Sequence, residues 1–431
     1  MGSFDKGLAA DTAAQASPTE KLPRRPTLRS GFIWTFAGNS IYAAGQWGIL
    51  SLFAKFGGSE MLGQYALAAA ATAPVGMLFH LNLRSVLATD VNRQRPFGDY
   101  LAFRLGASAL SLVVIAGVAC ISTNSATLIW TIIAVGAGHS IEAVSDLFLG
   151  AMQRREQMQQ VALSMILRTV VSVAALAVAL AMTRHLSWSV FAMTAARLAV
   201  LLIRDVPTGK RGEDLSRSGM ASAIAIFRTA LPLGIVLMLV SLIANLPRYA
   251  IESTMGFEQL GVFAALISFV TIGSTVVNAL GQSVTPRLAG HFREGQKGAF
   301  LGILGRMVGL VVLLGAVGSA CAWGFGGLLL TLLYRPEFAD YGDLLAVAVG
   351  AGTLSYLAVV LGYAVTCARI FAVQAPLFAL SAAGCGIASW ILVPAYGLVG
   401  GILSIALAAT LQIIGQILIL AWAFRRQEQH A

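Results

Sequence analysis

Residues 58–66 read GSEMLGQYA, and residues 256–264, which lie 198 positions later, read GFEQLGVFA. The same offset places Ser85-Val86 over Ser283-Val284, so positions 58–86 share seven identities with their counterparts. A repeat at a fixed offset indicates that one structural unit occurs twice in a chain. The sequence therefore predicts two related halves, and the offset identifies the residues that correspond between them.

The composition points to a membrane environment for these halves. The chain has 431 residues, of which 57% are hydrophobic and 11% are charged, and its mean hydropathy is +0.79. Soluble domains carry about 25% charged residues. A run of about 20 apolar residues crosses the hydrocarbon core as a helix, whereas barrel strands alternate polar and apolar residues. We therefore expect an all-α polytopic membrane protein. Its net charge of +10 is spread over the loops, so no nucleic-acid partner is expected.

Twelve apolar spans are predicted, six in each half. They cover residues 30–54, 61–83, 100–121, 126–150, 161–182, 187–204, 223–246, 259–283, 301–323, 343–368, 371–393 and 397–423. This arrangement gives an N-terminal lobe at 30–204, a linker at 205–222 and a C-terminal lobe at 223–424. The tails at 1–29 and 425–431 are expected in the cytoplasm, the first of them disordered. Six spans per half gives two parallel, pseudo-symmetric lobes, and such lobes enclose a central cavity in several transporter folds.

The loop charges predict the orientation. With the N-terminus inside, 24 Lys and Arg residues fall on the cytoplasmic side, and only Lys55, Arg184, Arg248 and Arg335 fall outside. This bias follows the positive-inside rule. We expect a multi-pass protein of the bacterial inner membrane with both termini in the cytoplasm.

One predicted span carries a polar stripe. Its members recur at spacings of three and four residues, on one helix face: Ser268, Thr271, Thr275, Asn278, Gln282 and Thr285. Polar groups facing lipid are costly, so the stripe predicts a helix that lines a cavity. The repeat offset places His80 over Asn278 and Arg84 over Gln282, which extends the cavity prediction to the first lobe. The alternative is that these side chains bond to the carbonyl four residues back and pack between helices.

The first lobe contains charged residues at membrane depth. Glu142 and Asp146 share one face of the span at 126–150, and Arg168 and Arg197 lie in the two following spans. Two interpretations remain open. The carboxylates pair with the arginines and hold the lobe together, or a carboxylate binds a proton or cation that drives transport.

Further binding candidates lie in spans one and seven and beside the loop after span ten. Asn39 and Gln46 belong to span one, and Asn245 and Arg248 to the end of span seven. Arg84, Arg248 and Arg369 are candidates for an anionic headgroup, because guanidinium forks match phosphate oxygens. Arg248 and Arg369 can alternatively be boundary anchors that reach the interface.

The sequence contains no signature of catalysis. It has no G-x-x-x-x-G-K-[ST] phosphate loop, no nucleophile elbow and no His/Cys pattern with metal-ligand spacing. We therefore expect no enzyme activity, no catalytic residue, no metal and no cofactor.

Several segments resemble one family in their order and spacing. FAKFGG at 53–58, LGQYALA at 62–68 and LNLRSVLATD at 81–90 look like the front of a polysaccharide-biosynthesis flippase. The later segments are similar to its second half: 248–263, LLTLLY at 329–334 with EF at 337–338, and PAYGLVGG at 394–401. Over residues 30–423 the chain resembles the Wzx-type O-antigen and exopolysaccharide flippases. Their superfamily also contains multidrug/toxin extruders and lipid II flippases.

The resemblance implies a function and its partners. It implies two six-helix lobes around a cationic cavity, and translocation of undecaprenyl-diphosphate-linked oligosaccharide to the periplasmic leaflet by alternating access. It implies membrane lipids, a polysaccharide polymerase and a chain-length regulator as partners of a monomer. Arg84 lies within a matching motif, whereas Pro247 stands where the family often has an acid before the residue matching Arg248. The alternatives are a cation-coupled multidrug extruder of the same fold and a non-transporting scaffold subunit of a polysaccharide-synthesis complex.

Overall fold

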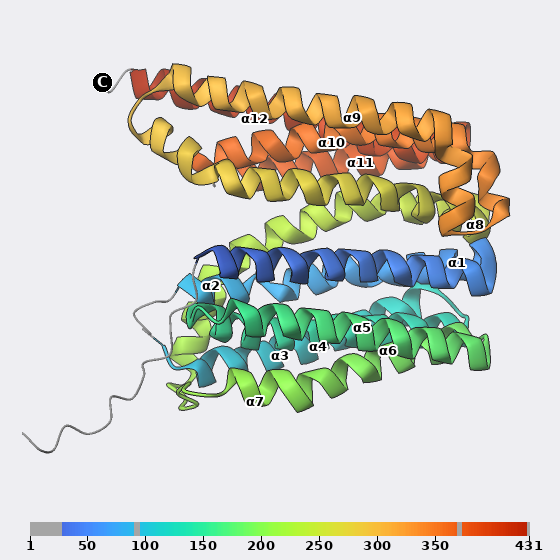
Figure 1. The fold of residues 1–431 in the computed structure, drawn as a ribbon, viewed down its shortest axis with the longest axis horizontal. Helices are drawn as coiled ribbons and strands as arrows, with labels where there is room; N and C mark the ends of the chain where they lie inside the picture. Colours follow the sequence, from blue (N-terminus) through green and yellow to red (C-terminus); the bar gives the residue numbers. More distant parts are fainter. Residues whose placement is uncertain (1–27, 90–94, 369–372, 429–431) are drawn as a thin grey trace, which may run out of the picture.

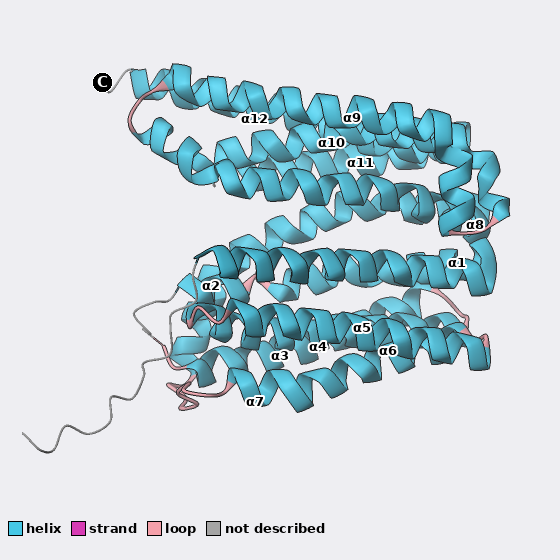
Figure 2. Ribbon diagram, viewed as in Figure 1, coloured by secondary structure: helices cyan, strands magenta, loops and turns pink. Residues whose placement is uncertain are grey.

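The computed structural model describes residues 28–89, 95–368 and 373–428. Arg369, one of the binding candidates, lies outside these residues. The described chain contains helices and loops and no strand (Figure 2). The helices are α1 (Leu28–His80), α2 (Leu83–Thr89), α3 (Phe97–Ser122), α4 (Ala126–Arg154), α5 (Met158–Thr183), α6 (Leu186–Val200), α7 (Val206–Gly209), α8 (Met220–Arg293), α9 (Lys297–Leu333), α10 (Gly342–Cys367), α11 (Gln374–Tyr396) and α12 (Leu398–Glu428). A π-helical segment at Leu201–Asp205 and a 3₁₀ helix at Pro336–Tyr341 complete the list.

Ten helical stretches in the described residues are long and apolar enough to cross a membrane, which confirms the predicted all-α polytopic class. Two of the helices are far too long for one crossing. α1 has 53 residues and α8 has 74, so α1 alone would be about 80 Å long if it were straight. The hydrocarbon core is only about 30 Å thick. Figure 1 shows that both helices fold back at the same end of the molecule.

Each reversal occurs at a glycine with positive φ. Gly58 has φ 71° and Gly256 has φ 81°, a region that side chains with a Cβ rarely adopt. These glycines are 198 positions apart, which is the offset of the sequence repeat. The repeat therefore encodes the same chain reversal in both halves. Counting each folded helix as two spans gives the predicted twelve, and the number of crossings stays a prediction.

The two halves form separate helical bundles that meet at the end where α1 and α8 reverse, and diverge toward the other end (Figure 1). At the meeting point Gly63 and Gly261 pack backbone against backbone. A Cβ on Gly63 would collide with the carbonyl oxygen of Phe257, and a Cβ on Gly261 with the carbonyl oxygen of Ser59. Both pairs, 63/261 and 59/257, are separated by 198 positions. The contact is therefore reciprocal, and a pseudo-two-fold axis passes through it.

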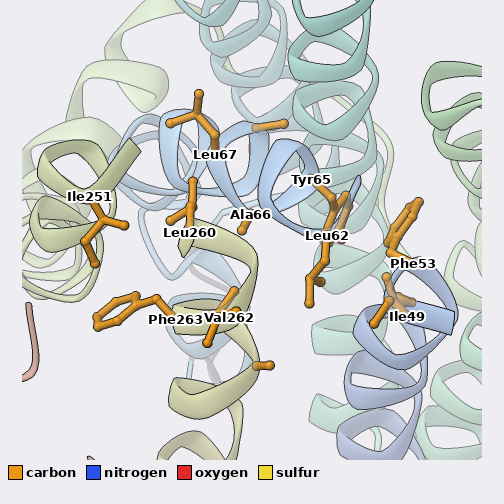
Figure 3. Close-up of a cluster of buried hydrophobic side chains, with 14 of the residues drawn as sticks. Ile49, Phe53, Leu62, Tyr65, Ala66, Leu67, Ile251, Leu260, Val262 and Phe263 are labelled. Atoms are coloured by element: carbon orange, nitrogen blue, oxygen red, sulfur yellow. The ribbon is translucent and has the colours of Figure 1, made fainter. Parts of the chain in front are cut away.

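Apolar side chains and hydrogen bonds complete the contact between the bundles. Figure 3 shows Leu62 and Ala66 of α1 gathered with Leu260, Val262 and Phe263 of α8 in one buried cluster. Tyr249 donates to the carbonyl of Ala70 at 2.6 Å, and Trp47 donates to the Tyr334 hydroxyl at 2.9 Å. The Ser51 hydroxyl donates to the carbonyl of Leu333. The meeting end is thus closed by packing and by hydrogen bonds.

α8 begins against the first bundle and continues in the second. Ile226 and Ala230 belong to a core cluster with Leu81, Phe97, Tyr100 and Phe148 of the first bundle. Farther along, Ile243 packs with Ala382 and Cys385 of α11. Pro232 lies between these two regions of the helix. The first half of α8 therefore bridges the bundles, which the predicted spans did not indicate.

The segment predicted as the linker, residues 205–222, packs on the first lobe. Glu213 pairs with Arg154, and its side chain is almost fully buried. The backbone N–H of Ser218 donates to Asp99 at 2.8 Å, and Gly98 donates to the carbonyl of Asp214 at 3.0 Å. The predicted lobe boundaries stay a prediction, but the linker is not a free tether.

Candidate functional site

The charged residues of the first lobe form one connected network. Glu142 and Asp146 lie one turn apart on α4, so both carboxylates point to the same side. Arg168 of α5 lies between them, with a nitrogen 3.6 Å from a carboxylate oxygen of each. Arg197 of α6 lies 3.9 Å from Glu142, and Tyr42 of α1 donates to Glu142 at 2.8 Å. These distances agree with the interpretation that both carboxylates form ion pairs within the lobe. A coupling role for either one stays a prediction.

The network has an accessible side. His80 lies 3.3 Å from Asp146, and Arg84 lies 3.9 Å from it and donates to Gln153 at 3.2 Å. We call His80, Arg84 and Asp146 the accessible triad. Their side chains are 25%, 28% and 19% exposed, whereas that of Arg168 is 5% exposed. The triad is therefore the more exposed part of the network.

A broken helix positions the triad. α1 ends at His80, and the next two residues, Leu81 and Asn82, have φ of 52° and 46° before α2 starts. Positive φ is uncommon for residues other than glycine and costs about 1–3 kcal/mol when the surroundings enforce it. The break turns the chain so that Arg84 reaches Asp146 and Gln153.

A buried arginine satisfies the carbonyls that the break frees. Arg104 of α3 is only 1% exposed, and it donates to the carbonyls of Phe79 at 3.0 Å and His80 at 2.6 Å. The sequence analysis did not select Arg104. Arg104 could have been selected as a lone arginine in an apolar span. The sequence does not show, however, which carbonyls it binds.

The deep side of the network is closed to any headgroup. Tyr42, Gln46, Glu142, Arg168 and Arg197 line a pocket of about 10 Å³, which is the space of about one water molecule. Within that half of the network, Arg168 and Glu142 hold helices α4 and α5 together. An anion larger than water does not fit in this small pocket.

The buried charges do not balance. Six arginines lie in or beside the network, namely Arg84, Arg104, Arg168, Arg197, Arg204 and Arg248. The described residues place three carboxylates with them: Glu142, Asp146 and Asp205, the last held by the hydroxyls of Ser145 and Ser164. Six positive and three negative charges leave an excess of +3 with neutral histidines. Buried charges are stable only when they are paired, so this excess favours an anionic ligand.

Arg248 contributes to the excess from the second lobe. It follows Pro247 on α8, and its buried Nε has no hydrogen-bond partner in the described residues. No carboxylate of the described chain pairs with it. Asn245, one turn earlier, instead donates to the carbonyl of Ser241 at 2.7 Å within its own helix.

Most residues of the polar stripe form hydrogen bonds within their own helix, and some of them are nevertheless exposed. Thr271, Thr275 and Thr285 each donate to the carbonyl four residues back, and Asn278 donates to that of Ser274, as the alternative interpretation stated. Ser268 is buried against Tyr334. Thr271, Thr275 and Gln282 are nevertheless exposed. In span one, Asn39 is also exposed, and Gln46 lines the small pocket.

The comparisons with known proteins agree with this architecture. The family described as polysaccharide biosynthesis protein matches residues 28–291, which is more than half of the chain. Capsular polysaccharide biosynthesis protein CapF of Staphylococcus aureus is 22% identical over 387 residues, covering 89% of this chain and 96% of that protein.

Two solved structures of multidrug resistance MATE family transporters of the MOP superfamily share the fold. The inward-facing conformation aligns with a TM-score of 0.68 at 11% identity, covering 91% of this chain and 98% of that one. The outward-facing conformation aligns with a TM-score of 0.59 at 12% identity, covering 91% and 93%. The predicted resemblance is confirmed: this chain belongs to the polysaccharide biosynthesis protein family and has the fold of MOP-superfamily transporters.

Proposed function

We propose that the protein flips undecaprenyl-diphosphate-linked oligosaccharide from the cytoplasmic to the periplasmic leaflet of the bacterial inner membrane by alternating access. The observation that carries this proposal is the excess of positive charge in and beside the network, part of which is exposed at the accessible triad. A diphosphate supplies the missing negative charge, and guanidinium forks suit its oxygens. Small cationic drugs would increase the imbalance, so the charge count disfavours the multidrug alternative.

In this proposal Asp146 is the partner of His80 and Arg84 until the substrate binds. Arg84 and His80 both contact Asp146, and both are partly exposed. The diphosphate replaces Asp146 as their partner, while Arg168 keeps Asp146 neutralised from the buried side. The prenyl chain stays in the lipid between the lobes. A scaffold subunit would have no need for exchangeable ion pairs of this kind.

The described conformation fits the start of such a cycle. The lobes meet at the end that the positive-inside rule assigns to the periplasm, and they diverge toward the cytoplasmic end (Figure 1). The higher TM-score with the inward-facing transporter agrees with this orientation. The lipid-linked donor is made on the cytoplasmic side, where the inward-open state would receive it.

Lipid analysis of a deletion strain tests the function. We expect undecaprenyl-diphosphate-linked repeat units to accumulate on the cytoplasmic side and polymer export to stop, with both defects reversed by the wild-type chain. Unchanged export together with new sensitivity to cationic dyes would instead support the drug extruder. Lost export that an Arg84→Glu chain restores in full would support the scaffold.

Alternating access predicts that a cross-link at the meeting end stops transport. The Ser51 hydroxyl donates to the carbonyl of Leu333, so these two residues are neighbours across the contact between the bundles and form the pair to test with cysteines. In a background without the four native cysteines, S51C/L333C is expected to cross-link on oxidation and to lose export, and a reductant is expected to restore it. Undiminished export by the fully cross-linked protein would contradict alternating access. Each single cysteine variant serves as the control.

Disrupting the glycine contact is expected to slow the formation of the same cross-link. Gly261→Ala places a Cβ against the carbonyl of Ser59, which is backbone and cannot move aside. Overpacking of this kind costs about 1–3 kcal/mol, so the equilibrium constant for closing the meeting end falls about 5- to 150-fold. We expect a lower S51C/L333C cross-linking rate. Gly106→Ala on α3, where a Cβ meets nothing within 4 Å, is the matched control and should leave the rate unchanged.

A further inference from the structure

The two lobes present different chemistry at corresponding positions. The offset of 198 pairs His80 with Asn278 and Arg84 with Gln282. The reciprocal packing of Gly63 and Gly261 shows that this offset is a two-fold relation in space as well as in sequence. From that contact the second halves of α1 and α8 run on opposite sides of one axis. α1 ends at His80 whereas α8 continues to Arg293, so Arg84 of α2 and Gln282 of α8 correspond in sequence only. At these corresponding positions the first lobe carries a cation and the second lobe a neutral amide.

The corresponding part of α8 has no charge at all. Residues 259–286 contain no Asp, Glu, Lys or Arg, although they supply the polar stripe. The excess positive charge described above therefore lies on the first lobe and at Arg248, and the stripe adds nothing to it. A ligand held between the lobes meets charges on one wall and neutral donors and acceptors on the other.

The packing of α8 shows which of its faces is open. Gly273 packs against Tyr356 of α10, Gly281 packs against Tyr363, and Val277 between them is fully buried. The opposite side is exposed and has two flanks. One consists of Ile272 and Val276, which suit lipid.

The other flank consists of Thr271, Thr275 and Gln282, which are also exposed; we call these three the neutral polar face. An amide without a hydrogen-bond partner in the described residues, such as that of Gln282, is costly in hydrocarbon, and Thr271 and Thr275 share its helix face. The neutral polar face therefore lies toward the other lobe rather than toward lipid.

The hydrogen-bonding state of these residues defines a ligand class. Thr271 and Thr275 donate to carbonyls of their own helix at 3.0 Å each, which leaves their oxygens free to accept. Gln282 makes no hydrogen bond recorded within the described residues, so its amide offers two donors and an acceptor. Sugar hydroxyls and acetamido groups both donate and accept, and they carry no charge. They complement this face, whereas a diphosphate does not.

We propose that the neutral polar face binds the uncharged sugars of the lipid-linked oligosaccharide, while the first lobe holds the diphosphate. This inference rests on the proposed function. It makes the second lobe the part that distinguishes one repeat unit from another. The first lobe then recognises what all such substrates share.

The test uses the purified full-length protein and two probes. One probe is undecaprenyl diphosphate without sugar, and the other is the sugar-bearing lipid that accumulates in the deletion strain. The variants are Thr275→Val, which is isosteric, Gln282→Leu, and the two combined. Ser283→Ala is the matched control. This exposed serine donates to the carbonyl of Leu280 in its own helix, and it lies two turns after Val276, on the flank of Ile272 and Val276.

We expect the wild type to bind the sugar-bearing lipid more tightly than the bare lipid. The combined variant should lose about five-fold or more in affinity for the sugar-bearing lipid and keep its affinity for the bare one, since each hydrogen bond is worth a few-fold. Thr275→Val alone should show part of this loss, and Ser283→Ala none. Equal losses for both probes, or no loss for either, would overturn the inference while leaving the proposed function intact. A wild type that binds neither probe would overturn the proposed function itself.

Discussion

Arg168→Met is expected to lower the free energy of unfolding by about 3–5 kcal/mol. Removing this arginine leaves Asp146 with His80 and Arg84, and leaves Glu142 with Arg197 at 3.9 Å and the Tyr42 hydroxyl at 2.8 Å. Breaking a buried ion pair from one side costs this much because each remaining carboxylate loses its buried cationic partner. Thermal unfolding of the purified protein in detergent measures the effect. Arg306→Met on α9, where the arginine is exposed, is the matched control and should stay close to wild type.

A compensating variant separates charge from packing. If the loss comes from orphaned carboxylates, Glu142→Gln and Asp146→Asn added to Arg168→Met should recover much of the stability. Arg168→Met with wild-type stability would show that the network contributes little. A loss that the neutral amides fail to recover would assign it to packing.

Arg84→Glu is expected to reduce polymer export by at least about 30-fold without reducing the amount of protein in the membrane. The side chain of Arg84 is more exposed than those of Arg168 and Arg197, so a diphosphate would reach Arg84 before either of them. Truncating one partner of a charged contact costs about 2–5 kcal/mol, and 2 kcal/mol is about 30-fold in binding. Reversal adds repulsion of the phosphates. Export measured in the complemented deletion strain, normalised to protein in the membrane fraction, gives the result.

Two further variants make the Arg84 result specific. Arg84→Lys keeps the charge but loses the fork, so it should retain part of the export. Arg306→Glu reverses an exposed arginine of α9 that lies outside the network, and it should export normally. Normal export by Arg84→Glu would remove Arg84 from the binding site and would leave the charge excess without its proposed role.

The fold was largely predictable from the sequence, because hydropathy and the repeat can both be recognised without knowing which helices are in contact. The two glycines of the repeat, Gly58 and Gly256, mark the two chain reversals. The path of α8 was not predictable, because an apolar span does not state which bundle it packs against. Ile226 and Ile243 read alike in the sequence, yet they lie in the cores of different lobes.

The candidate site was predictable in its members and less so in its connections. Helical spacing placed Glu142 and Asp146 on one face, but it could not show that Arg168 bridges them. The break after His80 and its satisfaction by Arg104 depend on tertiary packing that overrides an apolar, helix-forming sequence. The threonines of the stripe bond to their own helix, which spacing alone could not distinguish from contact with a ligand.

Reconstitution of the purified protein into liposomes tests the central proposal most directly. The substrate is the lipid-linked oligosaccharide that accumulates in the deletion strain, and its appearance in the opposite leaflet is followed with a membrane-impermeant sugar-specific reagent. We predict translocation by the wild type and none by Arg84→Glu or by oxidised S51C/L333C. Liposomes that move a cationic dye but leave the lipid in its original leaflet would contradict the flippase proposal.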